Sequence, residues 1–100
     1  MDKRLELHNE LLKFFKNVYY QPPSNIVMKY PCIVLNKVPG FKNFSNNSRY
    51  IKVQAYSLTL IEFDPDSVKA NEIEEYFEYC EIDQYYIRDG LNHTTLTLYY

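Results

Sequence analysis

The segment from Arg49 to Phe63, RYIKVQAYSLTLIEF, carries the longest β-strand pattern in the chain. Side chains on a strand point alternately to its two faces, so this pattern predicts one long β-strand over residues 49–63. Ile51, Val53 and Ala55 share one face, whereas Tyr56, Leu58 and Leu60 lie on the other. A strand that changes its apolar face needs a bulge or a bend, which we expect near Ala55.

Three further segments predict strands that pair with this one. Residues 30–38 contain the short apolar run CIVL after a proline, which is typical of a buried strand. Residues 82–88 and 93–100 predict two more strands, joined through the turn dipeptide Asp89-Gly90. The segment VYY, residues 18–20, can add a short edge strand.

Two segments have the spacing of amphipathic helices. From about residue 2 to 17 the apolar residues recur at steps of three and four, until the pair Pro22-Pro23 stops the pattern. A second helix is expected over residues 66–79, after an Asp-Pro-Asp-Ser turn that offers an N-cap. The chain is therefore predicted to be a single α+β domain, residues 1–100, with a mostly antiparallel sheet of about four to five strands and two helices packed on it.

Between the first two predicted long strands lies the segment PGFKNFSNNS, residues 39–48. Its Gly, Asn and Ser content indicates a loop, or a β-excursion with a mobile tip. The segment holds two phenylalanines, Phe41 and Phe44, which a loop would expose.

Charge is distributed unevenly along the chain, although the net charge is only −2. No Asp or Glu occurs between Leu11 and Ile61, whereas residues 62–90 are strongly acidic. The basic residues of the first segment are Lys13, Lys16, Lys29, Lys37, Lys42, Arg49 and Lys52. This asymmetry suggests a partner, either nucleic acid on the basic segment or a second copy docking head to tail. Alternatively, the two segments neutralise each other within one fold.

The sequence contains no convincing catalytic set, cofactor motif or metal site. Asp89 and His93 have no nucleophile nearby, and helix capping accounts for Asp64 and Asp66 without a cation. Two glycines in the chain leave no room for a Gly-rich phosphate loop. We therefore predict no enzymatic activity, no cofactor and no metal.

The two cysteines and the hydropathy of the chain suggest an intracellular, soluble protein. Cys32 and Cys80 have no CxxC spacing, so buried free thiols are expected, with a disulfide as the next alternative. No apolar run approaches the ~20 residues that span a membrane, and the N-terminal segment lacks the apolar core of a signal peptide.

Cations and aromatic rings alternate between residues 37 and 52, a pattern typical of proteins that hold single-stranded nucleic acid. Four cations over sixteen residues also fit an ordinary solvated hairpin, and the negative net charge argues against strong backbone binding. A small nucleic-acid-binding module therefore remains an alternative function.

Three segments together resemble small tail proteins of long-tailed bacteriophages, known as tail terminator, tail completion or minor tail proteins. These segments are YPCIVL (30–35), NNSRYIKVQAYSLTLIEFDPDS (46–67) and YCEIDQYYIRDGLNHTTLTLYY (79–100). The matching residues are Tyr30, Pro31, Cys32, Ile33, Val34, Asp64, Pro65, Asp66, Ser67, Cys80, Asp89, Leu91, Asn92, His93, Tyr99 and Tyr100. Gly90 replaces an Asn that is frequent in the family, and the segment FKNFSNNS lacks the acidic residue expected there.

The resemblance implies a virion structural protein, which assembles in the bacterial cytoplasm and resides in the tail or neck. It implies a homohexameric ring at the head-proximal end of the tail tube, where it stops tube growth and joins the tail to the neck. The implied partners are further copies of the chain, the tail tube protein, a neck or head-completion protein, and double-stranded DNA passing without sequence specificity. A head-closure or tube-adaptor protein of the neck is a close alternative.

A ring of this kind needs two different, complementary surfaces on each subunit, which the basic and acidic segments could supply. Arg49 and Lys52 are also candidates to line a DNA-conducting lumen. Asn92 and His93 are expected to hydrogen-bond the Asp89-Gly90 turn or an adjacent subunit. The complete set of predicted interface residues is Lys37, Phe41, Lys42, Phe44, Arg49, Lys52, Asp64, Asp66, Arg88, Asp89, Asn92 and His93.

Overall fold

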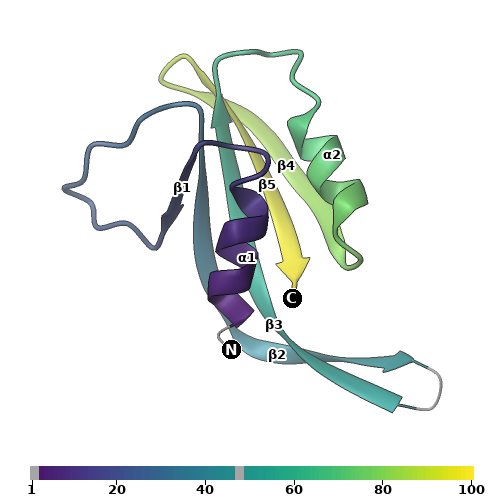
Figure 1. Cartoon of the computed structure of the whole chain (residues 1–100). Coiled ribbons are helices and arrows are strands. Elements are labelled where there is room, and N and C mark those ends of the chain that lie inside the picture. The colour runs from purple at the N-terminus through teal and green to yellow at the C-terminus, as the bar shows by residue number, and fades with distance from the viewer. Residues whose placement is uncertain (1–2, 47–48) are drawn as a thin grey trace.

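The computed structural model describes the backbone of residues 3–46 and 49–100, and the side chains of these residues except those of 40–53. It contains two helices and one five-stranded sheet in the order α1-β1-β2-β3-α2-β4-β5 along the chain (Figure 1). The strands are arranged β1-β2-β3-β5-β4 in the sheet. β1 runs parallel to β2, and every other neighbouring pair is antiparallel. The predicted α+β fold is confirmed.

Helix α1, Lys3–Leu11, ends six residues earlier than predicted. The next turns tighten, with the backbone N–H of Phe14 donating to the carbonyl of Leu11 at 3.0 Å. Phe15, which follows this turn, has a buried side chain. Strand β1, Asn17–Tyr20, then pairs with residues Cys32–Leu35. Pairing of β1 with β2 provides hydrogen bonds for backbone N–H and C=O groups that would otherwise be bonded within a longer helix. The predicted edge strand is confirmed.

The sheet is dominated by two long strands, β2 (Cys32–Asn46) and β3 (Arg49–Glu62). β2 begins after the cis Tyr30–Pro31 peptide bond and runs through most of the segment predicted as a loop or β-excursion, so the β-excursion is the observed alternative. The register shifts between Val38 and Phe41, opposite Ala55 and Gln54 of β3. The irregularity expected near Ala55 is therefore present, but it lies on the partner strand, where Pro39 lacks a backbone N–H.

The second half of the chain forms α2 (Lys69–Tyr76) and the hairpin of β4 (Cys80–Arg88) and β5 (Leu91–Tyr99). The helix is shorter than predicted at both ends. Asp89 and Gly90 connect the two strands with φ values of 53° and 75°. Two successive left-handed residues are what a two-residue hairpin turn requires, so the predicted turn is confirmed.

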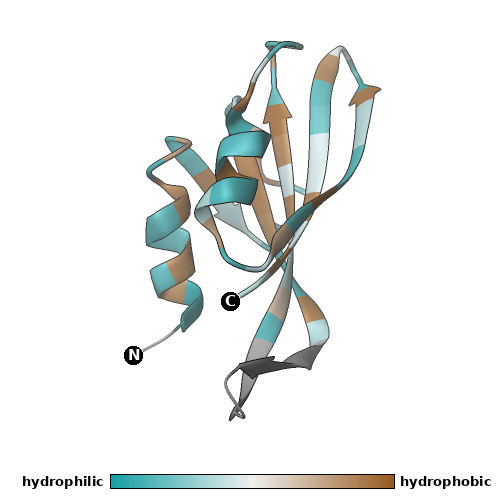
Figure 2. Ribbon diagram, turned by 90° about the vertical axis from the view of Figure 1, so that its right-hand side faces the viewer, coloured by the Kyte–Doolittle hydropathy of each residue, from teal (hydrophilic) through white to brown (hydrophobic). Residues whose placement is uncertain are grey.

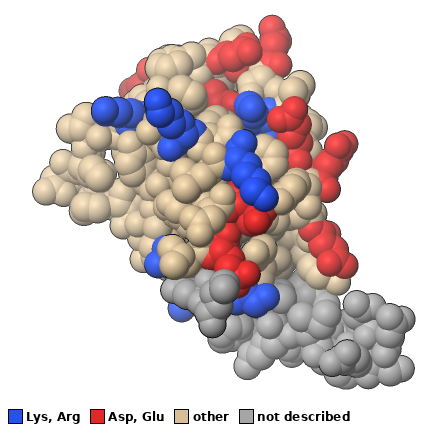
Figure 3. All heavy atoms as spheres, viewed as in Figure 1, with Lys and Arg blue, Asp and Glu red and all other residues tan. Residues whose placement is uncertain are grey.

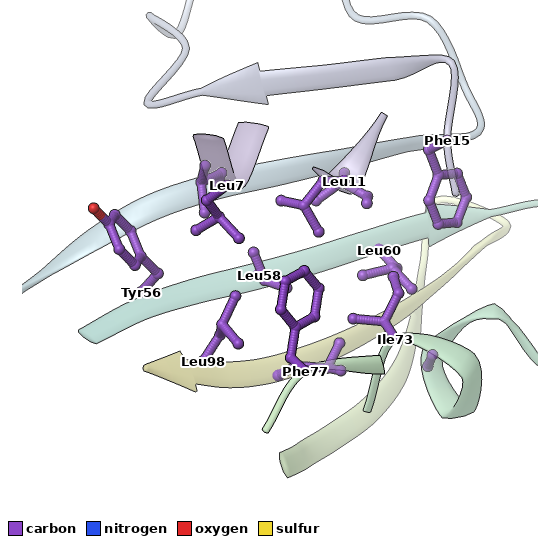
Figure 4. Close-up of a cluster of buried hydrophobic side chains, with 13 residues drawn as sticks. Leu7, Leu11, Phe15, Tyr56, Leu58, Leu60, Ile73, Phe77 and Leu98 are labelled. Carbon is purple, nitrogen blue, oxygen red and sulfur yellow. The ribbon is translucent and has the colours of Figure 1, made fainter. Parts of the chain in front are cut away.

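Both helices pack on the same face of the sheet (Figure 2). Between them and the sheet lies one apolar core, in which Leu7 and Leu11 of α1 and Ile73 of α2 are fully buried (Figure 4). The strands contribute the alternate residues that face this layer, among them Leu58 and Leu98. Burial of so many aliphatic side chains, each contributing ~1.5–3 kcal/mol, is the main stabilising term.

The opposite face of the sheet has a different composition. Residues paired across β3 and β5 on this face include Ser57 with Thr97 and Thr59 with Thr95. These four side chains are only partly buried, which is consistent with a face that neither helix covers. Threonine and serine suit such positions because they combine strand propensity with a hydroxyl that tolerates water.

Candidate functional site

The β2–β3 hairpin extends beyond the rest of the sheet as a two-stranded ribbon (Figure 1). β1 pairs with β2 only as far as Leu35, and β5 pairs with β3 only as far as Ala55. From there, residues 41–46 and 49–54 pair only with each other in the described backbone. We call these paired residues, 41–46 and 49–54, the ribbon.

Gln54 fixes the base of the ribbon. Its side-chain Nε2 donates to the carbonyl of Val38 at 2.5 Å, at the register shift. Its own carbonyl accepts the backbone N–H of Tyr100 at 3.0 Å. These bonds join the ribbon to the end of β5 and set the direction in which it leaves the body.

The ribbon contains five of the predicted interface residues. Phe41, Lys42 and Phe44 belong to β2, and Arg49 and Lys52 belong to β3. Their side chains lie outside the described residues. Lys37 lies at the base, where its side chain is exposed and its backbone N–H donates to Gln21 Oε1 at 3.1 Å.

The other predicted residues lie at the opposite end of the sheet, where β3 ends and the β4–β5 hairpin turns (Figure 1). Asp64 and Asp66 are exposed, and Asp64 Oδ1 accepts the backbone N–H of Asp66 at 2.9 Å. Neither caps α2, whose N-cap is Val68 with no side-chain hydrogen bond. The expected capping role is therefore wrong, because the helix begins one turn after the acidic residues.

The Asp-Pro-Asp-Ser turn is instead held through its serine. Ser67 Oγ donates to Glu62 Oε1 at 2.7 Å and accepts the backbone N–H of Lys69 at 3.3 Å. These bonds link the end of β3 to the first residue of α2. Asp64 and Asp66 consequently remain available at the surface.

Asn92 has a structural role at this end. It is buried, and its Nδ2 donates to the carbonyls of Glu62 at 3.4 Å and Phe63 at 3.2 Å. Its Oδ1 accepts the hydroxyl of Tyr85 at 2.5 Å. The expected contact with the Asp89-Gly90 turn is not observed, because the side chain points across to the end of β3.

His93 and Arg88 both contact the ring of Tyr86 on the β4–β5 hairpin. The His93 ring lies 4.9 Å from the Tyr86 ring at an interplanar angle of 15°, and the Arg88 guanidinium lies 5.4 Å from the same tyrosine. His93 Nδ1 is 3.1 Å from the carbonyl of Leu91. Arg88 and Asp89 are exposed, so this tip presents both charges to solvent.

The structure thus divides the predicted interface residues between two ends. Cations dominate the ribbon end, and Asp64, Asp66 and Asp89 occupy the other. A single intersubunit contact between the ribbon and these acids would require one copy to lie end to end with the next.

The sequence did not identify a pocket of about 400 Å³ beside the base of the ribbon. We call it the tyrosine pocket. Its lining includes four tyrosines and two carboxylates, which come from α1, the end of α2, the segment between α2 and β4, and the end of β5 with the residue after it. These residues are Glu10, Tyr76, Glu78, Tyr79, Tyr99 and Tyr100.

A network of rings and charges organises this pocket. Glu10 Oε2 accepts the Tyr76 hydroxyl and the Lys13 Nζ, the latter at 3.0 Å. These two donors, Tyr76 first, lower the pKa of Glu10, so the carboxylate stays charged near neutral pH. Phe77 meets the rings of Tyr76 and Tyr100 edge to face at 5.0 and 6.1 Å.

The carboxylates of Glu6 and Glu10 also act on Tyr100, another residue of the pocket. The pKa of the Tyr100 hydroxyl is raised by burial and then by Glu6 and Glu10. Figure 3 shows further acidic side chains along the side of the molecule that carries α2. The only sequence signals for the pocket were the surplus of tyrosine and the segment EYFEYC, residues 75–80.

Neither cysteine is an activated nucleophile. Cys32 and Cys80 are free, and burial raises the pKa of their thiols to about 11 and about 12. Within the described part of the chain, no three His, Cys, Asp or Glu side chains are placed to hold a metal ion. Among the described helices, none has the length and hydropathy needed to cross a membrane.

Three candidate surfaces thus emerge from the described residues: the ribbon, the tyrosine pocket beside its base, and the charged tip at the other end. No family model, no curated protein and no solved structure matches the chain, so its function has to be inferred from these surfaces and from its residues.

Proposed function

We propose that this chain is a structural protein of a long-tailed bacteriophage, a tail terminator that assembles as a homohexameric ring. In this role it sits at the head-proximal end of the tail tube, stops tube growth and joins the tail to the neck. The observation that carries the proposal is the ribbon, a self-paired arm that leaves the body and has no neighbouring strand beyond its base. Its support from the sequence is the resemblance of the YPCIVL, DPDS and DGLNH segments to the family.

An arm of this kind suits assembly better than a catalytic role. A two-stranded ribbon alone is marginally stable in water, and its outer edges carry unpaired backbone groups. Contact with another chain would satisfy both needs. A ring requires heterologous contacts, in which one surface of a subunit meets a different surface of the next, and the ribbon and the body would form such a pair.

The two ends of the sheet would then serve different partners. The ribbon end would join neighbouring subunits, and the exposed tip with Asp64, Asp66 and Asp89 would meet the tail tube protein or a neck protein. DNA would pass through the lumen, held only by nonspecific charge. A head-closure or tube-adaptor protein of the neck would use the same two surfaces.

A small nucleic-acid-binding module is the second candidate, and the ribbon itself favours it. A projecting two-stranded ribbon can enter the major groove of DNA, and this one contains Lys42, Arg49 and Lys52 but no carboxylate. Binding of this kind would weaken steeply as salt increases.

The two candidates differ in the solution behaviour that they predict without nucleic acid. Light scattering over a concentration series should show a species of six chain masses, and negative-stain images should show rings. A monomer at every concentration, with salt-sensitive binding to oligonucleotides, would contradict the ring and support the nucleic-acid-binding module. Reversing the charges of Arg49 and Lys52 should weaken assembly and leave the monomer folded.

A further inference from the structure

We propose that the tyrosine pocket of one subunit receives the ribbon of the next subunit. This inference rests on the proposed homo-oligomer and names the two surfaces that form its contact. The occupant is thus a defined segment of a second copy, residues 41–46 and 49–54.

The composition of the ribbon defines what it needs from a partner. Residues 41–54 contain Lys42, Arg49 and Lys52 with the aromatic residues Phe41 and Phe44, and no acidic residue. Residues 41–46 pair with residues 49–54, and no further strand pairs with them in the described backbone. A complementary surface should therefore offer carboxylates for the cations and aromatic rings for both the cations and the phenylalanines.

The tyrosine pocket has this chemistry. Its two carboxylates, Glu10 and Glu78, flank the rings of four tyrosines. The same rings already attract cations within the chain: Lys13 Nζ lies 5.7 Å from the Tyr76 centroid and Lys3 Nζ lies 5.6 Å from the Tyr100 centroid.

The position of the pocket prevents the ribbon from filling it within one chain. The ribbon begins beside the pocket, where Gln54 bonds the backbone of Tyr100, and then leads away from the body. Each of its strands has about six paired residues, which span about 20 Å. That length is comparable to the two shorter dimensions of the molecule, 28 and 22 Å, so the ribbon can reach across a neighbour.

The arrangement also satisfies the symmetry of a ring. The ribbon and the pocket belong to the same end of the sheet, so a rotation about an axis along the strands keeps them at the same height. One copy can then donate its ribbon to the next around a closed circle. The acids at the other end, Asp64, Asp66 and Asp89, cannot meet the ribbon under the same rotation.

Charge reversal on each surface gives a direct test. The pocket-reversed variant is E10K/E78K and the ribbon-reversed variant is K42E/R49E/K52E. Each alone should require an at least about tenfold higher concentration to assemble, because like charges then face each other. An equimolar mixture should assemble again, since in an alternating ring each acidic ribbon meets a basic pocket and each basic ribbon meets an acidic one. Circular dichroism checks that both variants are folded.

The matched control places the same charge change on α2, outside the pocket. Glu72 and Glu75 are exposed and do not line the pocket, so E72K/E75K should assemble alone and should not rescue the ribbon-reversed variant. A pocket-reversed variant that assembles normally, or a mixture that stays dissociated, would overturn the pocket contact and leave the ring proposal standing. A wild-type chain that never assembles would overturn both.

A spectroscopic reporter tests insertion itself. The chain contains no tryptophan, so F44W introduces a single one in the ribbon. Its fluorescence emission should shift to shorter wavelength when the ring forms, and Y79A should reduce that shift. Unchanged emission in an assembled F44W ring would show that the ribbon tip stays in water and would overturn the proposal.

Discussion

At the scale of single residues, Asn92 shows how the position of a polar group decides its role. In sequence it stands between a turn and a strand, which suggests a surface contact. In the structure it lies across from Glu62 on the core-facing side of β5, and it joins three elements through its amide. A buried amide with both its donor and its acceptor used contributes to stability mainly because leaving its partners unsatisfied is costly.

Replacing Asn92 by Ala should lower the free energy of unfolding by about 2 kcal/mol, because the carbonyls of Glu62 and Phe63 and the Tyr85 hydroxyl lose their partner. Urea denaturation followed by circular dichroism measures the change. Tyr85→Phe removes only one of these hydrogen bonds, from a half-exposed side chain, and should cost about 1 kcal/mol or less. Equal stability of Asn92→Ala and the wild type would show that water replaces the amide.

The two thiols give a prediction about pH. Burial raises the pKa of Cys32 to about 11, from an ordinary value of 9.0, so at pH 8 only about one molecule in 1,000 carries the reactive thiolate. The thiol reagent DTNB should therefore label the native protein far more slowly than it labels glutathione. Labelling should accelerate with urea and about tenfold per pH unit between pH 8 and 10. Rapid labelling at pH 8 without urea would contradict the burial of Cys32 and the partial burial of Cys80.

At the scale of elements, the β4–β5 hairpin depends on backbone conformation more than on packing. Gly90 has a φ of 75°, and a Cβ added there would meet no atom within 4 Å. The cost of a substitution at this position should therefore come from the left-handed conformation alone.

Gly90→Asn should change the free energy of unfolding by less than about 0.5 kcal/mol, because Asn adopts this conformation readily. Gly90→Val should lower it by about 1–2 kcal/mol, because a β-branched residue does not. Chemical denaturation of the two variants side by side separates strain from packing. An equal loss in both would indicate a contact of the side chain rather than backbone strain.

Strand positions were more predictable from the sequence than helix boundaries. Alternation placed β3 within one residue at each end, because both faces of a central strand constrain its pattern. The first helix was predicted to reach residue 17 but ends at Leu11, because pairing of Asn17–Tyr20 with β2 competes with helical hydrogen bonds. Such long-range pairing leaves no local signal in an apolar segment that fits either state.

At the scale of the whole molecule, the sequence identified the residues of the ribbon but not the surface beside it. The basic and aromatic residues of the ribbon lie within one short segment, 41–52, so their pattern can be recognised in the sequence. The tyrosine pocket combines Glu10, Tyr76, Tyr79 and Tyr100 from three separate parts of the chain. Only the pairing of β5 with β3, and the packing of both helices on one face, bring these residues together. The charge order in the sequence suggested Asp64 and Asp66 as the counterpart of the ribbon, whereas the fold puts them at the other end.

The same arrangement predicts how a protease distinguishes the free chain from the ring. In a monomer the ribbon pairs only with itself, so it should open locally at low cost in free energy, and trypsin should cut first after Lys42, Arg49 or Lys52. In the ring a neighbouring body would cover the ribbon, and these cuts should slow by about tenfold or more while cleavage after the exposed Lys69 is unchanged. Mass spectrometry of digests taken below and above the assembly concentration measures both rates. First cleavage at the same sites and at the same rate in the assembled protein would place the ribbon outside the subunit contact, because a segment that a neighbour covers cannot open without first leaving it.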